Sequence, residues 1–549
     1  MWNSLSKRFT NSFLYESEDI THYYLKTEFI NRLYFYYCKN GYYNIISTQI
    51  VNILTTSFTL FIIIFLFNCI DYDGIIDIRE DTHLIEVVNM NNFFKLSAFY
   101  WCLLVIFLFF IACKIFSLID DIFSFKTIKN YYKDTLKIKD SQLSNTSWET
   151  IVDKMNLYYQ NQDINPYTIN NKIMIQDNYF IALIDKGIFK LKYLTRLMEW
   201  NLRYTIIHYI FDENIKPRKD ILINKTNHVN SIKTRITIVS IMNFIFMPLI
   251  MGFMIFYSLF EYCEKFYNKP ELIKTRSWTK LALWKFREYN ETYHIFHERI
   301  KKANKSAQEY TGQFHSRLLE TFSHLVVFIA GTFFTILIFL SIINENILIK
   351  LYISDTKTVI WFLGILATII TFFRTMIKDS IMFYPNKYMK ELRKSISFFP
   401  EFWEETATTK NVKESFFNLY QYKLSILCQE IFITLMVPFD LYSLNDYVDE
   451  IVTFIQLNTK KDPQLGLVCR NSIFKNFYSV NSDRKDEKTI QSFEHFKKIY
   501  PDWSKKHEYY SPNVNDSVKG ESIYVKTSPV LDNRSESNDS NNDGNLLII

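Results

Sequence analysis

Residues 236–260 read ITIVSIMNFIFMPLIMGFMIFYSLF, and no charged side chain occurs in these 25 positions. A helix of this length can cross the hydrocarbon core of a bilayer. Basic residues nevertheless lie on both sides of it, and positively charged flanks prefer the cytosolic face. Pro248 and Gly252 lie near the middle, where they can break a helix and turn the chain back. The segment therefore predicts a re-entrant wedge, which deforms or opens one leaflet of a membrane. The flanking basic residues are Lys216, Arg218, Lys219, Lys225, Lys233 and Arg235 before it and Lys265, Lys269, Lys274, Arg276 and Lys280 after it.

Four other apolar stretches each predict a membrane-crossing helix: 45–70, 96–113, 325–343 and 358–373. The loop 71–94 is acidic, whereas the chain before the first stretch and after the second is basic, which places the N-terminus in the cytosol. The fourth stretch has only 16 uncharged residues, so we expect its helix to continue past Arg374 with that side chain snorkelling. A short apolar piece with a proline, 431–442, predicts a second wedge. Four crossings leave both termini cytosolic.

Composition limits the class of protein. The chain has 549 residues, of which 48% are apolar and 22% charged, so apolar spans alternate with sizeable water-facing regions. The net charge of +6 is mild for this length and does not indicate nucleic-acid binding. Seven dispersed cysteines predict reduced thiols, and we expect no signal peptide because the first forty residues are polar. No phosphate-binding glycine loop occurs, which argues against an ATP-driven pump.

The regions between the spans predict helices. One apolar face is formed by Phe180, Leu183, Ile184, Leu191, Leu194 and Met198, and another by Tyr289, Tyr293, Phe296 and Ile300. Because no strand-and-hairpin pattern stands out, the predicted class is an all-α integral membrane protein. His294 and His297 do not have the spacing of a zinc-binding HExxH helix, and we expect no metal. From about Ser504 the polar composition predicts a disordered tail.

These patterns divide the chain into wedges, spans and cytosolic parts. In chain order the segments are a cytosolic N-terminal segment (1–40), the first transmembrane hairpin (41–113), a cytosolic helical region (114–235), a re-entrant helix (236–260), a second cytosolic helical region (261–324), the second transmembrane hairpin (325–373), cytosolic helices (374–423), a second re-entrant helix (424–444), C-terminal cytosolic helices (445–503) and the tail (504–549).

Polar residues inside the spans have two interpretations. They could line a hydrated path, or their hydroxyls could bond back to the preceding helical turn and join helices together. For any single residue the second interpretation is favoured, and as a group they remain candidates for a polar groove. The residues are Asn52, Thr55, Thr56, Asn243, Thr335, Thr368 and Thr371.

Longer motifs in the chain resemble the autophagy-related protein 9 family over about residues 33–475. The matching motifs are NGYYNII (40–46), NCIDYDG (68–74), DSQLSNTSW (140–148), DNYFIALIDKG (177–187), EWN (199–201), WKFREYN (284–290), FIAG (328–331), LGIL (363–366), FNLYQYK (417–423) and LGLVC (465–469).

The resemblance implies a domain-swapped homotrimer with four transmembrane and two re-entrant helices per protomer. It also implies an ATP-independent phospholipid scramblase with no cofactor and no covalent chemistry. The implied membranes are Golgi-derived and other cytoplasmic vesicles, the preautophagosomal structure and the endoplasmic reticulum. The implied partners are phospholipids, other copies of the chain and a lipid-transfer protein of the autophagy-related protein 2 kind.

We expect the lipid path to have its cytosolic mouth just after the first wedge, with further polar residues on the fourth span. The mouth residues are Glu264, Lys265, Asn268 and Lys269, and those further along are Thr368, Thr371 and Arg374. Two other functions stay open. A passive scaffold would mark vesicles and recruit partners without moving lipid, and an ion channel would need a filter-like span, which the sequence does not show.

Overall fold

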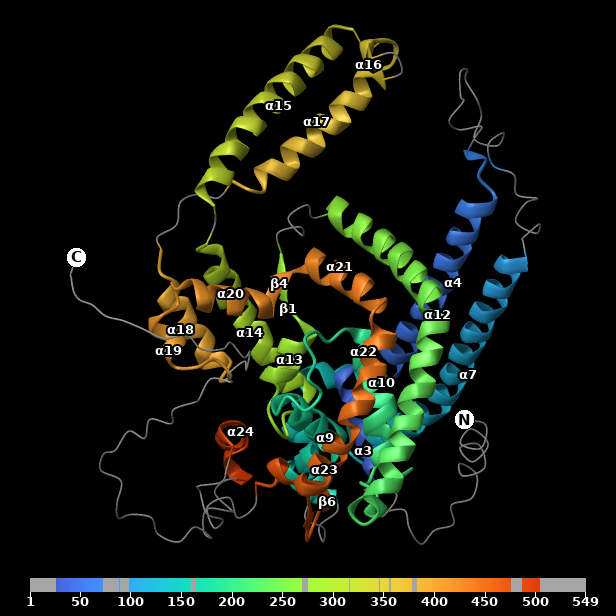
Figure 1. The fold of residues 1–549 in the computed structure, drawn as a ribbon, viewed down its shortest axis with the longest axis vertical. Helices are drawn as coiled ribbons and strands as arrows, with labels where there is room; N and C mark the ends of the chain where they lie inside the picture. Colours follow the sequence, from blue (N-terminus) through green and yellow to red (C-terminus); the bar gives the residue numbers. More distant parts are fainter. Residues whose placement is uncertain are drawn as a thin grey trace, which may run out of the picture.

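The computed structural model describes residues 26–72, 88, 98–158, 164–268, 275–314, 316–344, 346–354, 357–377, 383–474 and 486–503. Helices dominate these ranges, as the sequence predicts (Figure 1). The predicted luminal loop 71–94 lies almost wholly outside the described residues, and the predicted tail lies entirely outside them.

The first two predicted spans form a pair of helices, α4 (Tyr42–Asn68) and α7 (Ala98–Asp134), which pack along each other. The span α4 matches the predicted stretch 45–70. The predicted stretch ends at Cys113, and helix α7 continues beyond it without a break to Asp134. Lys114 lies within this helix, and its ammonium group donates to a hydroxyl of α4.

The third and fourth predicted spans form a second pair, α15 (Arg317–Ile343) and α17 (Val359–Arg374), which projects away from the rest of the molecule (Figure 1). Between them lie α16 (Asn346–Lys350) and two short strands, β2 (Tyr352–Ser354) and β3 (Lys357–Thr358). The expected continuation of the fourth span is wrong, because α17 ends at Arg374. Its 16 residues rise about 24 Å, less than the ~30 Å hydrocarbon core.

The first predicted wedge belongs to α12 (Lys225–Asn268), a single helix of 44 residues. The predicted break at Pro248 and Gly252 is wrong, since the helix continues through both residues. A proline removes one backbone hydrogen bond, and an apolar helix tolerates this loss by bending. Figure 1 shows the axis of α12 changing direction partway along its length. The next described element, β1 (Arg276–Trp278), begins eight positions after Asn268.

The second predicted wedge is broken. Helix α21 (Lys423–Thr434) is followed by α22 (Val437–Ser443), the short η6 (Leu444–Tyr447) and α23 (Val448–Asn458), and the axis turns by 68° between α21 and the helices after it. Pro438 occupies the first turn of α22, where the missing N–H costs no hydrogen bond. By length and composition, three described helices (α4, α12 and α15) could each cross a membrane, and this bent pair would make a fourth.

Three two-stranded sheets were not expected from the sequence. Strand β1 pairs with β4 (Tyr420–Tyr422), β2 with β3, and β5 (Thr459–Asp462) with β6 (Gly466–Cys469), all antiparallel. In the first sheet Arg276 lies opposite Tyr422 and Trp278 opposite Tyr420. This sheet joins the chain that leaves α12 to the chain that enters α21, so both membrane-directed segments meet at one place.

The remaining helices form a body with three apolar cores. Its helices are α3 (Thr27–Cys38), α8 (Trp148–Tyr158), α9 (Pro166–Asp185), α10 (Arg196–Leu202), α11 (His208–Ile210), α13 (Lys280–Phe286), α14 (Tyr293–Gly312), α18 (Pro385–Ser395), α19 (Phe402–Glu405), α20 (Lys410–Leu419) and α24 (Glu487–Ile499). Shorter one-turn pieces are η2 (Asp140–Asn145), η3 (Arg203–Ile207), η4 (Lys219–Leu222) and η7 (Arg470–Ser472).

The predicted apolar faces are confirmed in part. All six residues of the first face belong to the largest core or pack against it, but the prediction that they share one helix is wrong. Phe180, Leu183 and Ile184 lie on α9, Met198 lies on α10, and Leu191 and Leu194 lie in the chain between the two helices. In the second face Tyr289, Phe296 and Ile300 are buried, whereas Tyr293 is exposed and stacks on His297. The spacing fails at Tyr293 because this residue opens α14 after a loop, so the helical period does not extend back to Tyr289.

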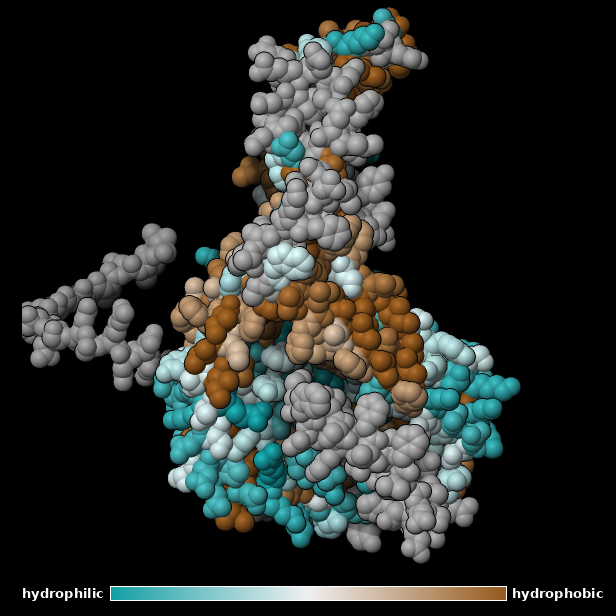
Figure 2. Space-filling model, turned by 90° about the vertical axis from the view of Figure 1, so that its right-hand side faces the viewer, coloured by the Kyte–Doolittle hydropathy of each residue, from teal (hydrophilic) through white to brown (hydrophobic). Residues whose placement is uncertain are grey.

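Exposed apolar side chains gather above this body. Figure 2 shows a hydrophobic band across the middle of the molecule and a hydrophilic surface below it. On α4 and α7 the exposed apolar side chains include Leu54, Phe58, Phe109 and Phe116, each more than half exposed. A surface of this kind is suited to lipid and not to water. The body lies on the hydrophilic side.

Candidate functional site

The polar residues expected on the fourth span lie on α17 and are exposed in the single chain. The hydroxyl of Thr368 donates to the carbonyl oxygen of Gly364 at 2.8 Å, and that of Thr371 to the carbonyl oxygen of Ala367 at 2.8 Å. Thr56 and Thr335 bond back in the same way, to Asn52 and Gly331. At these positions the hydroxyls bond back to the preceding helical turn, as the second interpretation expects.

The residues expected at the cytosolic mouth are divided between described and undescribed chain. Glu264, Lys265 and Asn268 lie in the last turns of α12, but their side chains are outside the described part, as is Lys269 altogether. Helix α17 packs against α15 and α16, and its hairpin stands apart from the end of α12 (Figure 1).

Polar side chains do meet along the seam between α4 and α7. Gln49 Nε2 donates to Asp121 Oδ2 at 2.7 Å, and Lys114 Nζ donates to Thr56 Oγ1 at 3.1 Å. Lys114 also lies over the ring of Phe110, 4.8 Å from its centroid. Thr56 is buried between the two helices. The seam thus holds an amide, a carboxylate, a hydroxyl and an ammonium group inside an otherwise apolar pair.

A second polar group lies between α12 and α22. Asn445 Nδ2, just after α22, donates to Thr237 Oγ1 at 3.2 Å. On the same face of α12, Ser240 and Asn243 are buried. Ser240 Oγ, Asn243 Nδ2 and Asn445 Oδ1 have no hydrogen-bond partner among the residues that the structure describes. Buried polar atoms without partners are costly, and such a site normally accommodates water or a polar ligand.

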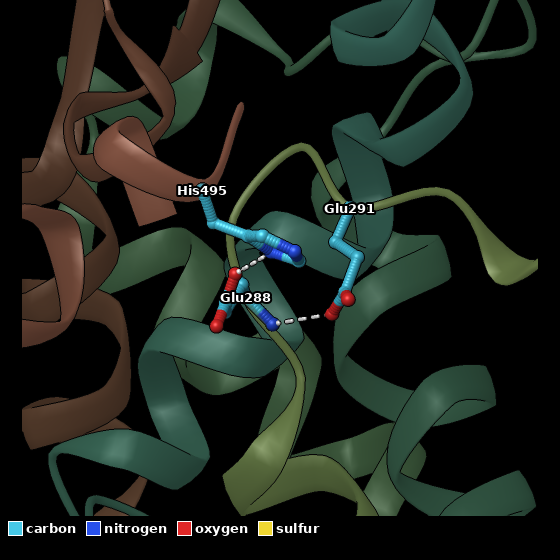
Figure 3. A group of neighbouring side chains, drawn as sticks. All are labelled: Glu288, Glu291 and His495. Atoms are coloured by element: carbon cyan, nitrogen blue, oxygen red, sulfur yellow. Dashed lines mark hydrogen bonds and ion pairs between the residues drawn. The ribbon is translucent and has the colours of Figure 1, made fainter. Parts of the chain in front are cut away.

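A buried carboxylate group lies deeper in the body, in the loop before α14 (Figure 3). His495 of α24 bonds Glu288 Oε2 through Nδ1 at 2.6 Å, and the backbone N–H of Glu288 donates to Glu291 Oε2 at 3.1 Å. Arg299 donates to both oxygens of Glu291 from Nε and Nη2, each at 2.7 Å. Burial alone would raise the pKa of Glu288, but Arg299 and the His495 hydrogen bond outweigh it and lower that pKa.

The three side chains Glu288, Glu291 and His495 are close enough to hold a metal ion. Their donor atoms are already used, because Ser397 also donates to Glu288 Oε1 at 3.0 Å and the guanidinium occupies both oxygens of Glu291. A fixed cation already neutralises the pair, so a metal would have to displace it. We therefore interpret the group as a structural ion network that fastens α24 to the body.

The histidines of the sequence motif His294–His297 lie elsewhere. His294 Nδ1 shares a hydrogen bond with the hydroxyl of Tyr34 at 2.8 Å, and its backbone N–H donates to the same hydroxyl at 3.0 Å. Burial lowers the pKa of His294 to about 4, so its ring is neutral near pH 7. The ring of His294 contacts Tyr34, whereas the ring of His297 stacks on Tyr293. The two histidines therefore have a packing role.

Sequence reasoning missed the two polar seams for different reasons. Thr56 was singled out as a polar residue in an apolar segment, but its partner Lys114 was not, because it lies 58 positions away. Asn243 was singled out as well, but Asn445, which bonds Thr237 on the same face of α12, was not, because it lies 202 positions from Asn243. Lys114 was treated as the boundary of a span. The signal that was present is a single lysine inside a long apolar helix, and an ionisable residue at membrane depth is a functional candidate by itself.

Comparisons with known proteins agree with the resemblance. A family model described as Autophagy protein ATG9 matches residues 26–475. Autophagy-related protein 9 of Saccharomyces cerevisiae is 28% identical over 492 residues, which cover 84% of this chain and 49% of that protein. Autophagy-related protein 9 of Dictyostelium discoideum is 28% identical over 524 residues, covering 89% and 74%.

The folds agree as well. The cryo-EM structure of Schizosaccharomyces pombe Atg9 superposes with a TM-score of 0.63 at 25% identity, covering 82% of this chain and 98% of that one. This chain spans about half the length of the S. cerevisiae relative. The family model nevertheless covers well over half of this chain, from before α3 to the start of the undescribed segment after η7. The chain is therefore a member of the ATG9 family of autophagy proteins.

Proposed function

We propose that this chain is an ATP-independent phospholipid scramblase, which equilibrates lipids between leaflets while autophagosome membranes expand. The observation that carries the proposal is the polar chemistry buried at helix seams of a lipid-exposed apolar surface, above all the unpartnered atoms of Ser240, Asn243 and Asn445. A polar head group loses its hydration in hydrocarbon at a cost of several kcal/mol or more, and a polar seam lowers that barrier by replacing lost hydrogen bonds.

The geometry of α12 supports a re-entrant arrangement within this proposal. Lys225, at its start, bonds Asp449 of α23, a helix that packs into the largest core of the body, and Arg276 pairs with Tyr422 in the β1–β4 sheet. The eight positions from Asn268 to Arg276 reach at most about 28 Å when fully extended. A bilayer with its head groups is about 40–45 Å thick, so a helix end on the far side could not rejoin the body within that length.

The second re-entrant segment, α21 with α22, is also too short to cross the bilayer and return. It starts at β4 and returns to the body, where α23 packs against α9. Helix α21 has 12 residues and rises about 18 Å, too little to cross. Four crossings (α4, α7, α15 and α17) and two re-entrant segments (α12 and the α21–α22 pair) then leave both termini on the cytosolic side.

The assembly and partners belong to the same proposal. The α15–α17 hairpin stands off from its own chain with exposed apolar faces, which favours packing against another protomer in a domain-swapped homotrimer. Such a trimer would also supply the neighbours that Thr368, Thr371 and Arg374 lack within one chain. We propose residence on Golgi-derived and other cytoplasmic vesicles, the preautophagosomal structure and the endoplasmic reticulum. A lipid-transfer protein of the autophagy-related protein 2 kind would deliver the lipid.

Reconstitution into liposomes tests the proposal. Purified protein is placed in vesicles with a fluorescent phospholipid in both leaflets, and a membrane-impermeant reductant is added without nucleotide. Scrambling predicts loss of fluorescence well beyond the outer half of the label. A plateau at half, as in protein-free vesicles, would leave the alternative of a non-transporting scaffold that seeds and recruits the autophagy machinery.

A further inference from the structure

The α4–α7 seam contains two polar pairs at different depths. In α4 the pairs are seven positions apart, at Gln49 and Thr56, and in α7 also seven apart, at Asp121 and Lys114. Matching intervals in opposite chain directions mean that the helices run antiparallel with one constant register. Seven residues of α-helix rise about 10 Å, which is the distance between the pairs along the helix axis.

This register places Lys114 within the hydrocarbon layer. The residues of α4 from Gln49 to its end at Asn68 rise about 28 Å, which matches the ~30 Å core. If the boundary of the hydrocarbon core lay at Thr56, the residues of α4 from there to Asn68 would rise only about 18 Å, which is too little to cross the core. The boundary therefore lies near Gln49, and the ammonium of Lys114 lies at the level of Thr56, about 10 Å deeper.

The charge of Lys114 is not neutralised at that depth. Its described contacts are the hydroxyl of Thr56 and the face of Phe110, and within the described chain no carboxylate forms an ion pair with it. A charged side chain held in the hydrocarbon layer is costly and normally faces a partner or a polar path. A lysine ammonium has three donors, so it can bind an anion while keeping its bond to Thr56.

A cleft of about 310 Å³ opens at the shallow end of the same seam. Gln49 and Asp121 line it together with Glu28, Asn31 and Arg32 of α3, and the rings of Phe35 and Phe125 stack in its wall with their centroids 5.7 Å apart. Arg32 pairs with Glu28 at 3.1 Å, so Asp121 is the carboxylate left beside the aromatic faces for an ammonium or choline group. The cleft and Lys114 thus offer, in sequence, sites for the positive and the negative part of a zwitterionic head group.

We propose that the α4–α7 seam is a head-group path of the scramblase, in which Lys114 binds the lipid phosphate below the surface cleft. This inference rests on the proposed function and names the residue that recognises its substrate. The ligand class is a glycerophospholipid with a phosphate and an ammonium group. Lys114 is a binding residue for the moving lipid, and no covalent step is involved.

The test compares Lys114→Met with Lys114→Arg, which keeps the charge, and with Lys126→Met, an exposed lysine on the same helix. Each full-length variant is reconstituted with labelled phosphatidylcholine or, separately, with a labelled glycosphingolipid that has no phosphate. Lys114→Met should slow phosphatidylcholine exchange about tenfold or more, because a charge-assisted hydrogen bond is lost. Exchange of the phosphate-free lipid by Lys114→Met, and both rates for Lys126→Met, should stay near those of the wild type. Lys114→Arg keeps the charge and should retain more phosphatidylcholine exchange than Lys114→Met.

The outcomes separate this inference from the proposed function. If the wild type scrambles and Lys114→Met exchanges phosphatidylcholine at the wild-type rate, the inference fails and the proposed function stands. Equal slowing of both lipids would assign Lys114 a structural role and also overturn it. A wild type without exchange would refute both. Inhibition by inorganic phosphate in place of chloride would assign the site to free phosphate. Should Lys114→Met not fold, Lys114→Gln, which keeps a polar side chain, must show the same selectivity.

Discussion

Replacing Arg299 by methionine should destabilise the body strongly. Its guanidinium is 9% exposed, and its bonds reach both oxygens of Glu291 and the carbonyl oxygens of Phe286 and Ser395, at 2.7–3.1 Å. Methionine keeps much of the side-chain volume but leaves two buried carboxylates, of Glu288 and Glu291, without their cation. Breaking a buried ion pair in this way costs about 3–5 kcal/mol, a large part of a typical unfolding free energy of about 5–15 kcal/mol.

Arg393→Met is the matched control. Arg393 pairs with Glu401 and Glu404, but Glu401 is 85% exposed, so losing this surface pair should cost at most about 1 kcal/mol. Urea unfolding of the detergent-solubilised protein, followed by fluorescence of its buried tryptophans, measures both variants. The double variant Arg299→Met/Glu291→Gln should recover part of the loss, because it removes one unpaired charge. A cost for Arg299→Met no larger than that of Arg393→Met would refute the structural role of this network.

Two further predictions concern the region around α3. Burial lowers the pKa of His294 to about 4 from an ordinary value near 6.5, so between these pH values the unfolded chain binds a proton that the folded chain does not. The contribution of His294 to the free energy of unfolding should therefore be fully present above about pH 6.5. It should fall by about 3 kcal/mol as the pH drops to about 4. His294→Gln should flatten this part of the pH profile of urea unfolding, and an unchanged profile would contradict the assignment. Gly41 has φ +103°, and an added Cβ would lie 3.1 Å from Cγ of Asp140; Gly41→Ala should therefore cost about 1–3 kcal/mol. Gly331→Ala, a helical position with open space around it, should be close to neutral in the same measurement, and equal effects of the two substitutions would refute the strain at Gly41.

Hydropathy alone predicted where the long apolar helices lie. A helix is stable in lipid when most side chains in a stretch of about twenty consecutive residues are apolar, and this can be read directly from the sequence. Both α4 and α15 agree with their predicted stretches to within a few residues at the end that faces away from the body. The burial of the apolar positions from Phe180 to Met198 was also predictable, but their placement on one helix was not, because α9 ends at Asp185 and α10 begins only at Arg196.

Features that depend on distant partners were not predictable in this way. Pro248 is a helix breaker by local rules, yet α12 continues through it, because an apolar surrounding offers its backbone no better partner than the helix itself. Strands β1 and β4 are three residues each and lie about 140 positions apart, too short for an alternation to show. Lys114 ended a predicted span by its charge alone, and only the structure shows that it bonds Thr56, 58 positions away.

The path expected through Glu264, Lys265, Asn268 and Lys269 stays a prediction, because their side chains lie outside the described residues. The structure adds two polar seams that one chain forms by itself. These seams and the expected mouth are not exclusive, since a trimer would place several such surfaces around a common axis.

The position of α14 relative to the membrane tests the re-entrant topology most directly. Lys302 of α14 and Lys357 of β3 are both exposed, and the proposed topology places them on opposite sides of the bilayer. Each is replaced by cysteine in a background without the seven native cysteines, and sealed vesicles with the cytosolic face outward are treated with a membrane-impermeant maleimide. The account predicts labelling at position 302 in intact vesicles and at position 357 only after permeabilisation. Protection of position 302 until the vesicles are opened would mean that α12 crosses the membrane, and would contradict the account.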